Sequence, residues 1–227
     1  MQDDDKKLAA EAAVAEIRDG MRVGLGSGTT VAFVIAAAGR RLAEWPGATF
    51  FSTSQRTTNA ARDAGIPISR FADRAELDLV IDGVDEIDPQ FRAIKGGGGA
   101  MLREKILASA ARRMVAIADG GKRVDVLGAR PVPVETLPFA RSFVAARAKE
   151  LGADPVLRIN MAGKEYRTNQ GNLVLDCRFG PITDPARLAL DLQAVPGALG
   201  HGLFLTEIDA LYVATGGIVT KMERPAP

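Results

Sequence analysis

The feature that most constrains the fold is a short apolar run followed by a glycine turn and a helical segment near the start of the chain. Met21–Leu25 is typical of a buried strand, Gly26–Thr30 of a tight turn and Val31–Leu42 of a helix. Strand, glycine loop and helix together form a β-α unit. The sequence therefore predicts an α/β fold, which is built from such units.

The same alternation continues along the chain and predicts the rest of the main sheet. Further short apolar runs typical of strands are Ala48–Ser52, Asp78–Ile81, Phe91–Ile94, Met114–Ala118 and Leu211–Ala214. The other predicted helices are Lys7–Arg18 (with possible caps at Asp3–Asp5), Gln55–Ala64 and Ala100–Arg112. We therefore expect a Rossmann-like, mostly parallel sheet flanked by helices, with ligand contacts beyond the carboxyl ends of its strands.

A second, smaller domain is predicted after the first. Two prolines in Ala129–Pro133 indicate a crossing out of the main sheet. The predicted helices beyond this point are 137–151 and 185–194, and the predicted strands are 155–159 and 173–179. This mixture predicts a small α+β lid domain, after which the strand at Leu211–Ala214 returns the chain to the first sheet.

Composition argues against several classes of protein. The 29 Lys and Arg against 28 Asp and Glu give a net charge of +1, which offers no positive field for nucleic acid. No run approaches the ~18 apolar residues of a membrane span, and the acidic start lacks the pattern of a secretory signal. Because Cys177 is the one cysteine and His201 the one histidine, we expect no internal disulfide and no Cys/His zinc site. These observations predict a cytoplasmic protein with no nucleic-acid or membrane partner.

The first glycine turn predicts a site for an anion. Gly24–Thr30 resembles a dinucleotide fingerprint, but Thr29 stands where the last glycine would be. A glycine turn with three hydroxyls before a helix instead suits a single phosphate, because backbone N–H groups and hydroxyls converge on it. The alternative is a purely structural turn in which Thr29 or Thr30 caps the helix.

Four carboxylates follow the apolar run 78–81, namely Asp82, Asp85, Glu86 and Asp88. Their mutual repulsion favours a functional interpretation, in which a proton, a polyol or a cation uses them. A solvated acidic loop and a Mg²⁺ site are the two alternatives.

A second glycine segment, Lys95–Gly99, precedes the predicted helix that carries Glu104. Since glycine loses more backbone entropy on folding than any other residue, we expect something to approach this backbone closely. On a helical wheel Glu104 shares a row with Ala100 and Ala108, away from the most solvated face. Arg103 is expected to be partly buried beside a carboxylate, because it falls within the apolar arc of Leu102, Ile106, Leu107 and Ala110.

These segments resemble the ribose-5-phosphate isomerase A family, whose hallmarks are a glycine and hydroxyl loop, Asp-Gly-x-Asp-Glu, and Lys-Gly-Gly-Gly followed by Arg-Glu-Lys. All three occur here in order, and the resemblance runs from about residue 8 to residue 221. Two departures are small: the loop reads Ser27–Thr30 where the family often has Thr-Gly-Ser-Thr, and Gly99 stands where alanine is common. The other matching stretches are Asp82–Glu86, Lys95–Ala100, Arg103–Lys105, Ala118–Asp119 with Lys122, and Pro131–Glu135.

The resemblance implies an aldose–ketose isomerase that interconverts D-ribose 5-phosphate and D-ribulose 5-phosphate through an enediolate, without cofactor or metal. This reaction belongs to the non-oxidative branch of the pentose phosphate pathway. By resemblance, Glu104 is the carbon base and Asp82 assists ring opening. Asp85 would hold hydroxyls, and Lys95 would offset the enediolate charge. The residues implied to bind substrate are Ser27, Gly28, Thr29, Thr30, Asp82, Gly83, Val84, Asp85, Lys95, Gly96, Gly97, Gly98 and Lys122.

The resemblance also implies a main domain of residues 1–130 and 205–227, a lid at 131–204, and a homodimer or homotetramer. Two rival interpretations have less support. An amino-sugar phosphate isomerase or deaminase often recruits a histidine, yet His201 lies in the predicted lid, far along the chain from the other site segments. A sugar-phosphate sensor needs a DNA-reading unit, and the roughly 20 residues before the first strand are too few for a helix-turn-helix.

Overall fold

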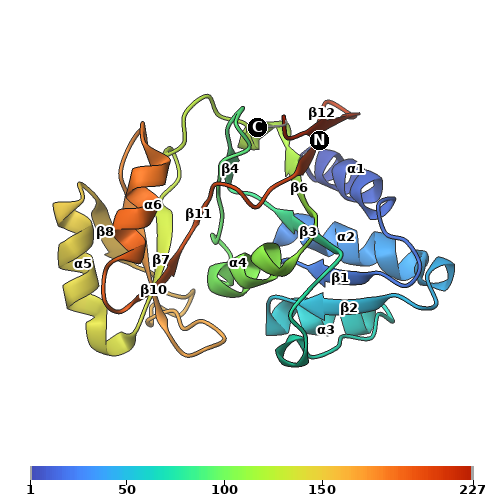
Figure 1. Cartoon of the computed structure of the whole chain (residues 1–227), viewed down its shortest axis with the longest axis horizontal. Helices are drawn as coiled ribbons and strands as arrows, with labels where there is room; N and C mark the ends of the chain where they lie inside the picture. The colour runs from blue at the N-terminus through green and yellow to red at the C-terminus, as the bar shows by residue number, and fades with distance from the viewer. Residues whose placement is uncertain (1, 226–227) are drawn as a thin grey trace. The chain divides into compact units, whose positions relative to one another are not determined.

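The computed structural model describes residues 2–225 and divides into two compact units (Figure 1). Unit 1 consists of residues up to 84, 103–123 and from 206 onward, and unit 2 of 85–102 and 124–205. These units differ from the predicted domains because 85–102, 124–130 and residue 205 belong to unit 2. The short strands in 85–102 pair within that unit, which explains the difference. Residues 1 and 226–227 of the predicted main domain lie outside the described residues.

A six-stranded sheet forms the centre of unit 1, with the strand order β13-β12-β6-β3-β1-β2. All neighbours are parallel except β13, which is antiparallel to β12. The strands are β1 Arg22–Leu25, β2 Thr49–Ser52, β3 Leu79–Gly83, β6 Met114–Asp119, β12 Ala210–Thr215 and β13 Ile218–Glu223. The helices are α1 Gln2–Val14, α2 Thr29–Arg40, α3 Gln55–Asp63 and α4 Met101–Ala110, whose first two residues belong to unit 2. There are 3-10 turns at Leu42–Glu44, Phe71–Asp73 and Gly120–Lys122. The predicted Rossmann-like, mostly parallel sheet is confirmed, although the sequence did not indicate β13.

Different helices pack on the two faces of this sheet. Because side chains alternate along a strand, successive residues face different helices. Val23 and Leu25 of β1 pack in the core formed with α1 and α2. Gly24 between them faces the other way, where a Cβ would lie 3.4 Å from Leu107 of α4. By the same alternation along β3, Asp82 lies on the α4 face.

Helix α1 begins and ends earlier than predicted. The acidic residues Asp3–Asp5 stand in its first turn, where the helix dipole favours them, and not before it as caps. Asp5 accepts hydrogen bonds from Gly216 N at 3.2 Å and Gly217 N at 2.8 Å, which tie α1 to the β12–β13 turn. The backbone bonds of residues 15–17 span three residues rather than four, so the helix tightens and ends. No helix within residues 2–225 is both long and apolar enough to cross a membrane.

Unit 2 contains two antiparallel sheets, with the strand orders β10-β7-β9-β8 and β11-β5-β4. The strands are β4 Glu86–Ile87, β5 Ala93–Ile94, β7 Val132–Thr136, β8 Asp154–Leu157, β9 Leu173–Arg178, β10 Ala198–His201 and β11 Leu203–Phe204. The helices are α5 Arg141–Glu150 and α6 Pro185–Gln193, with a 3-10 turn at Pro138–Ala140. The predicted α+β mixture is confirmed. The strand predicted at Phe91–Ile94 is β5 of this unit and does not belong to the main sheet.

The predicted crossing at Ala129–Pro133 is wrong in its last residues, since Val132–Thr136 forms the buried strand β7 between β10 and β9. Proline lacks an N–H donor and is usually excluded from such positions, so it indicated a linker. Here the Pro133 carbonyl still accepts a hydrogen bond from Gly202 N at 2.8 Å. Pro133 thus takes part in the sheet through its carbonyl group.

Candidate active site

The carboxyl ends of β1 and β3 form the centre of the candidate site in unit 1. The strand order places β2 on one side of β1 and β3 on the other, so the chain reverses its direction of winding there. Open α/β sheets bind ligands at such a switch point, beyond the carboxyl ends of the strands. The loop Gly26–Gly28 follows β1, and Asp82 is the penultimate residue of β3.

Asp82 organises the backbone of this loop. Its side chain belongs to a residue that is 1% exposed, and Oδ1 accepts hydrogen bonds from Ser27 N at 3.1 Å and Gly83 N at 2.7 Å. A Cβ at Gly26 would overlap the Asp82 carboxyl group. Gly26 is therefore required so that the carboxylate can pack directly against the loop.

Glu104 of α4 contacts the same loop. The residue is 3% exposed, and Ser27 Oγ donates to Glu104 Oε1 over 2.5 Å. Ser27 thus contacts both carboxylates, with its N–H on Asp82 and its hydroxyl on Glu104. The structure brings together three residues that the sequence predicted to share one site.

The helical-wheel prediction for α4 is confirmed in one part and wrong in another. Glu104 lies in one buried row with Ala100 and Ala108, as predicted. The predicted apolar arc is wrong at Ile106, which is exposed, whereas Leu107 is buried. Arg103 is half-buried, as expected. Compared with the predicted arc, the buried face of α4 is shifted away from Ile106 and toward Glu104. This face contains the carboxylate that contacts the loop after β1.

The start of α2 has the features of an anion site. Gly28 is its N-cap with φ 101°, a backbone conformation that favours glycine, and so no side chain covers the helix end. Thr29 and Thr30 are the first helical residues, so the alternative in which one of them caps the helix is wrong. A Cβ at Gly83 would lie 3.8 Å from Thr30 Cβ, which places this helix start beside the end of β3.

A chain of hydroxyls from α3 anchors the other side of the loop. Thr57 Oγ1 donates to Gly26 O at 2.8 Å, and Ser54 Oγ donates to Thr57 Oγ1 at 2.9 Å. Ser54 also caps α3 by accepting from Thr57 N at 3.0 Å. Neither Ser54 nor Thr57 was predicted from the sequence to contact the site. The run of hydroxyls at Ser52–Ser54, where β2 ends, is the signal that could have indicated them.

Val84 and Lys122 complete the predicted set in unit 1. Val84 is buried immediately after β3. Lys122 is half-exposed and ends the 3-10 turn that follows β6, the other neighbour of β3. Asp119 caps this turn by accepting from Gly121 N at 3.1 Å. Lys122 therefore belongs to the same edge of the sheet as the loop after β1.

The remaining predicted site residues, Asp85 and Lys95–Gly98, lie in unit 2. Asp85 Oδ2 accepts a hydrogen bond from Gly97 N at 2.8 Å. Lys95 is buried, and its Nζ lies 5.3 Å from the centre of the Phe204 ring, at the range of a cation–π contact. Its backbone N–H donates to Gly202 O at 2.9 Å.

The second glycine segment is approached closely, as predicted, and the approaching groups in this structure are the protein's own side chains. Gly96 has φ 101°, and a Cβ there would lie 2.5 Å from Met101 Cβ. A Cβ at Gly97 would lie 2.9 Å from Asp85 Oδ1, and one at Gly99 would overlap the Tyr166 ring. Gly96 and Gly99 are therefore required by local packing and by their positive φ, whereas at Gly97 only the end of the Asp85 side chain would have to shift.

Two of the four carboxylates in the acidic segment have structural partners. Glu86 accepts hydrogen bonds from Gly128 N at 2.8 Å and from Arg130 N. Asp88 accepts from Arg92 Nε at 2.6 Å. Both residues are buried, so the alternative of a solvated acidic loop is wrong for them. Within residues 2–225, no three His, Cys, Asp or Glu residues are grouped to hold a metal ion.

Cys177 and His201 both lie in unit 2. Burial raises the pKa of the Cys177 thiol to about 12, with a smaller contribution from the Asp176 charge. A thiol with this pKa stays protonated at neutral pH and is a poor nucleophile. His201 is buried, and its Nδ1 accepts from Leu203 N at 3.3 Å.

Comparison with known proteins first gives the class, which is that of the aldose–ketose isomerases. The family model described as ribose 5-phosphate isomerase A (phosphoriboisomerase A) matches residues 49–217. Ribose-5-phosphate isomerase A of Sphingopyxis alaskensis is 45% identical over 220 residues, which cover 97% of this chain and 96% of that protein. This chain therefore belongs to the ribose 5-phosphate isomerase A family.

Solved structures agree with this assignment. A D-ribose-5-phosphate isomerase in complex with phospho-erythronic acid matches with a TM-score of 0.95 and 32% identity, covering 99% of this chain and 100% of that one. Ribose 5-phosphate isomerase A of Neisseria gonorrhoeae matches with a TM-score of 0.93 and 33% identity, covering 100% of this chain and 99% of that one. The likeness extends over both units.

Proposed function

We propose that this protein interconverts D-ribose 5-phosphate and D-ribulose 5-phosphate through an enediolate, with Glu104 as the carbon base. The observation that carries the proposal is the 2.5 Å hydrogen bond between Ser27 Oγ and Glu104 Oε1. It joins a buried carboxylate to the loop that precedes α2. A sugar whose phosphate binds at that loop has its carbon chain within reach of the carboxylate. The reaction is a step of the non-oxidative branch of the pentose phosphate pathway.

The phosphate is assigned to Ser27–Thr30. The first backbone N–H groups of a helix have no partner within the helix, and the helix dipole favours a negative charge there. Gly28 adds no side chain that would block this end, and Thr29 is exposed. Phospho-erythronic acid, which a related isomerase binds, carries a phosphate and a carboxylate on a short polyol chain. That chemistry fits an anion site beside a site for an enediolate.

The proton transfers follow from the positions of the two carboxylates of unit 1. Glu104 removes the proton from C2 of the open-chain aldose, the C1–C2 double bond forms, and the C1 oxygen takes the negative charge. Glu104 then returns the proton to C1. Asp82, which assists ring opening before these steps, moves the proton of the C2 hydroxyl to the C1 oxygen. The burial of Glu104 at 3% exposure supports this role, because excluding water limits loss of the proton to solvent.

Asp85 and Lys95 of unit 2 are assigned supporting roles. Asp85 holds sugar hydroxyls, and the buried ammonium of Lys95 offsets the charge of the enediolate. A charge in a buried environment acts more strongly than one in water, which favours Lys95 over a surface lysine.

Proton exchange with solvent tests the assignment of the carbon base. Wild-type protein in D₂O should convert ribose 5-phosphate to ribulose 5-phosphate, with deuterium entering C1 of the ketose and, through the reverse reaction, C2 of the aldose, all measured by NMR. Glu104→Gln should show neither conversion nor exchange, because glutamine keeps the shape but cannot accept the proton. Asp82→Asn should retain some exchange from open-chain substrate. Near wild-type exchange in Glu104→Gln, together with none in Asp82→Asn, would reverse the assignment. Binding of ribose 5-phosphate by wild type without turnover would indicate a sensor instead.

The same proposal includes a homodimer or homotetramer. Several large apolar side chains of unit 2 are exposed in the single chain, and Phe139 and Met161 are fully so. Exposed apolar groups favour burial against another chain. Light scattering of purified protein at micromolar concentration measures the mass directly. A single 24.0 kDa species would contradict this part of the proposal.

A further inference from the structure

The second glycine segment is held by an arginine that the proposed mechanism does not use. Arg158 Nη1 donates to Gly96 O at 3.0 Å and to Gly97 O at 3.1 Å. The same guanidinium donates from Nε to Asp176 Oδ2 at 2.9 Å, and from Nη2 to Asp176 Oδ1. The planar fork therefore connects two successive loop carbonyls to a carboxylate on β9.

The position of this guanidinium is closely restricted. The Arg158 side chain is 13% exposed, and its Cζ lies 5.8 Å from the centre of the Tyr166 ring. Tyr166 itself occupies the space that a Cβ at Gly99 would need, and its hydroxyl donates to Gly98 O at 3.4 Å. Arg158, Tyr166 and Asp176 thus form one support for the loop.

The direction of the two carbonyls fixes the direction of the next two N–H groups. In a trans peptide the N–H points opposite to the carbonyl of the preceding residue. Because Gly96 O faces Arg158, Gly97 N–H faces away from it, and its 2.8 Å hydrogen bond to Asp85 agrees with this. Since Gly97 O also faces Arg158, Gly98 N–H points away from it as well. Gly98 is exposed, so this N–H can reach a ligand.

We propose that Arg158 is a positioning residue, which aims the Gly98 N–H at the sugar oxygen that becomes negative in the enediolate. This inference rests on the proposed function. Glycines give a loop many conformations, so an N–H group on it is a useful donor only if something else fixes its direction. A donor that is fixed before the reaction stabilises developing charge without reorganisation. Arg158 supplies that constraint from outside the loop.

Arg158→Lys and Arg167→Lys form a matched pair for the test. Arg167 lies in the same unit and, like Arg158, joins a carboxylate to glycine backbone, with bonds to Glu165 Oε2 at 2.7 Å and to the single carbonyl Gly171 O at 3.2 Å. Both variants keep the positive charge and lose the fork, but only Arg158 contacts the loop. We expect Arg158→Lys to lower kcat by about tenfold to a hundredfold, somewhat less than the ~10²- to 10³-fold loss on removing such a donor outright. KM should change less than kcat, and Arg167→Lys should resemble wild type.

Amide hydrogen exchange, measured by NMR without substrate, gives a second readout that does not depend on activity. The Gly97 and Gly98 N–H groups should exchange faster in Arg158→Lys than in Arg167→Lys. Equal kcat values for the two variants would overturn the proposal, and so would faster exchange with an unchanged kcat. If Arg158→Lys does not fold, Asp176→Asn takes its place, because it keeps the guanidinium but removes the negative charge and one of the two acceptor oxygens that hold it on β9. Turnover of ribose 5-phosphate by the wild-type protein tests the proposed function. The ratio of the kcat of Arg158→Lys to that of wild type tests the present inference.

Discussion

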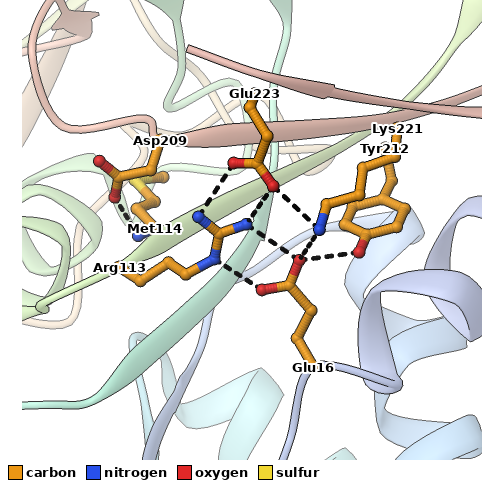
Figure 2. A network of polar contacts seen from close by, with 7 residues as sticks. All are labelled: Glu16, Arg113, Met114, Asp209, Tyr212, Lys221 and Glu223. Atoms are coloured by element: carbon orange, nitrogen blue, oxygen red, sulfur yellow. Dashed lines mark hydrogen bonds and ion pairs between the residues drawn. The ribbon is translucent and has the colours of Figure 1, made fainter. Parts of the chain in front are cut away.

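Unit 1 contains buried or partly buried carboxylates at two places beside its six-stranded sheet, and their hydrogen-bond partners differ. Near the amino ends of β6 and β12, Glu16 accepts from Arg113 Nε at 2.6 Å, Tyr212 Oη at 2.7 Å and Lys221 Nζ at 3.1 Å (Figure 2). Glu223 joins the same ion-pair network through Arg113 and Lys221. At the carboxyl ends of β1 and β3, the hydrogen bonds described for Asp82 and Glu104 come from backbone amides and one hydroxyl.

Under the proposed function, the difference separates a stabilising use of carboxylates from a chemical one. Burial raises the pKa of the Glu16 carboxyl, but hydrogen bonds from Arg113, Tyr212 and Lys221 outweigh it and hold the pKa at about 2. A group with that pKa stays charged at neutral pH and is a weak base. Such a network would lower the basicity of a carboxylate that must take a proton from carbon. The two places therefore predict opposite outcomes for the same Glu→Gln change.

The largest expected effect is the loss of catalysis in Glu104→Gln. Loss of a general base should lower kcat by about 10²- to 10⁴-fold, with a smaller change in KM and a thermal midpoint close to wild type. Glu16→Gln is the matched control and should behave in the opposite way, with near wild-type kcat and a lower thermal midpoint. Kinetics and thermal melts of both variants measure this. Similar losses of kcat in the two variants would abolish the distinction.

A smaller effect is expected from removing one hydroxyl at the start of α2. Thr29→Val should raise KM for ribose 5-phosphate by about tenfold to 150-fold, which corresponds to ~1.5 to 3 kcal/mol for a hydrogen bond to a charged group. The control is Thr58→Val, because the Thr58 hydroxyl bonds Ser52 and Ser54 O within the protein. An unchanged KM in Thr29→Val would move the phosphate elsewhere, and Lys122 would be examined next.

The main sheet and much of the site could be predicted because their signals are local. The strand, turn and helix at 21–42 lie within one short stretch, and the glycine and hydroxyl loop reads directly from it. Glu104 was placed off the solvated face by helical periodicity alone, which its burial confirms. The rest required contacts between distant residues.

The residues that escaped prediction have no local signature. Arg158 is one of many arginines, and its loop partners lie 61 and 62 residues away. Arg113 and Glu223 are 110 residues apart, so their pairing cannot be inferred from either segment. β13 was missed because it is an exposed edge strand without a continuous apolar run. β7 was missed because Pro133 indicated a linker.

The ion-pair network predicts a specific dependence of stability on pH. The pKa of Glu16 in the folded protein is about 2, below the ordinary value of 4.5. The contribution of the charged Glu16 to the free energy of unfolding is therefore fully present above about pH 4.5 and is lost as the pH falls toward 2. Allowing for partial exposure and screening, we expect this contribution to be ~1 to 2 kcal/mol. Urea unfolding of wild type and Glu16→Gln at pH 7, 4 and 2.5 measures it. The difference in unfolding free energy should shrink steadily with acid, and a constant difference would show that Glu16 acts by packing and not by charge.

The smallest expected effect is that of metal removal. In the ion-pair network the carboxylates are neutralised by Arg113 and Lys221. Chelation tests whether the acidic segment after β3 is neutralised in a similar way by a metal ion. Glu86 already accepts hydrogen bonds from two backbone N–H groups, and Asp88 accepts one from the Arg92 guanidinium. A metal ion would have to displace these donors. After prolonged treatment with EDTA and assay in metal-free buffer, kcat should stay within about twofold of its starting value, whereas an enzyme that relies on a metal for charge stabilisation would lose most of its rate. Glu104→Gln, treated in parallel, gives the background rate. If chelation abolished turnover and Mg²⁺ or Mn²⁺ restored it, the enediolate charge would have to be assigned to a cation instead of Lys95 and the Gly98 N–H.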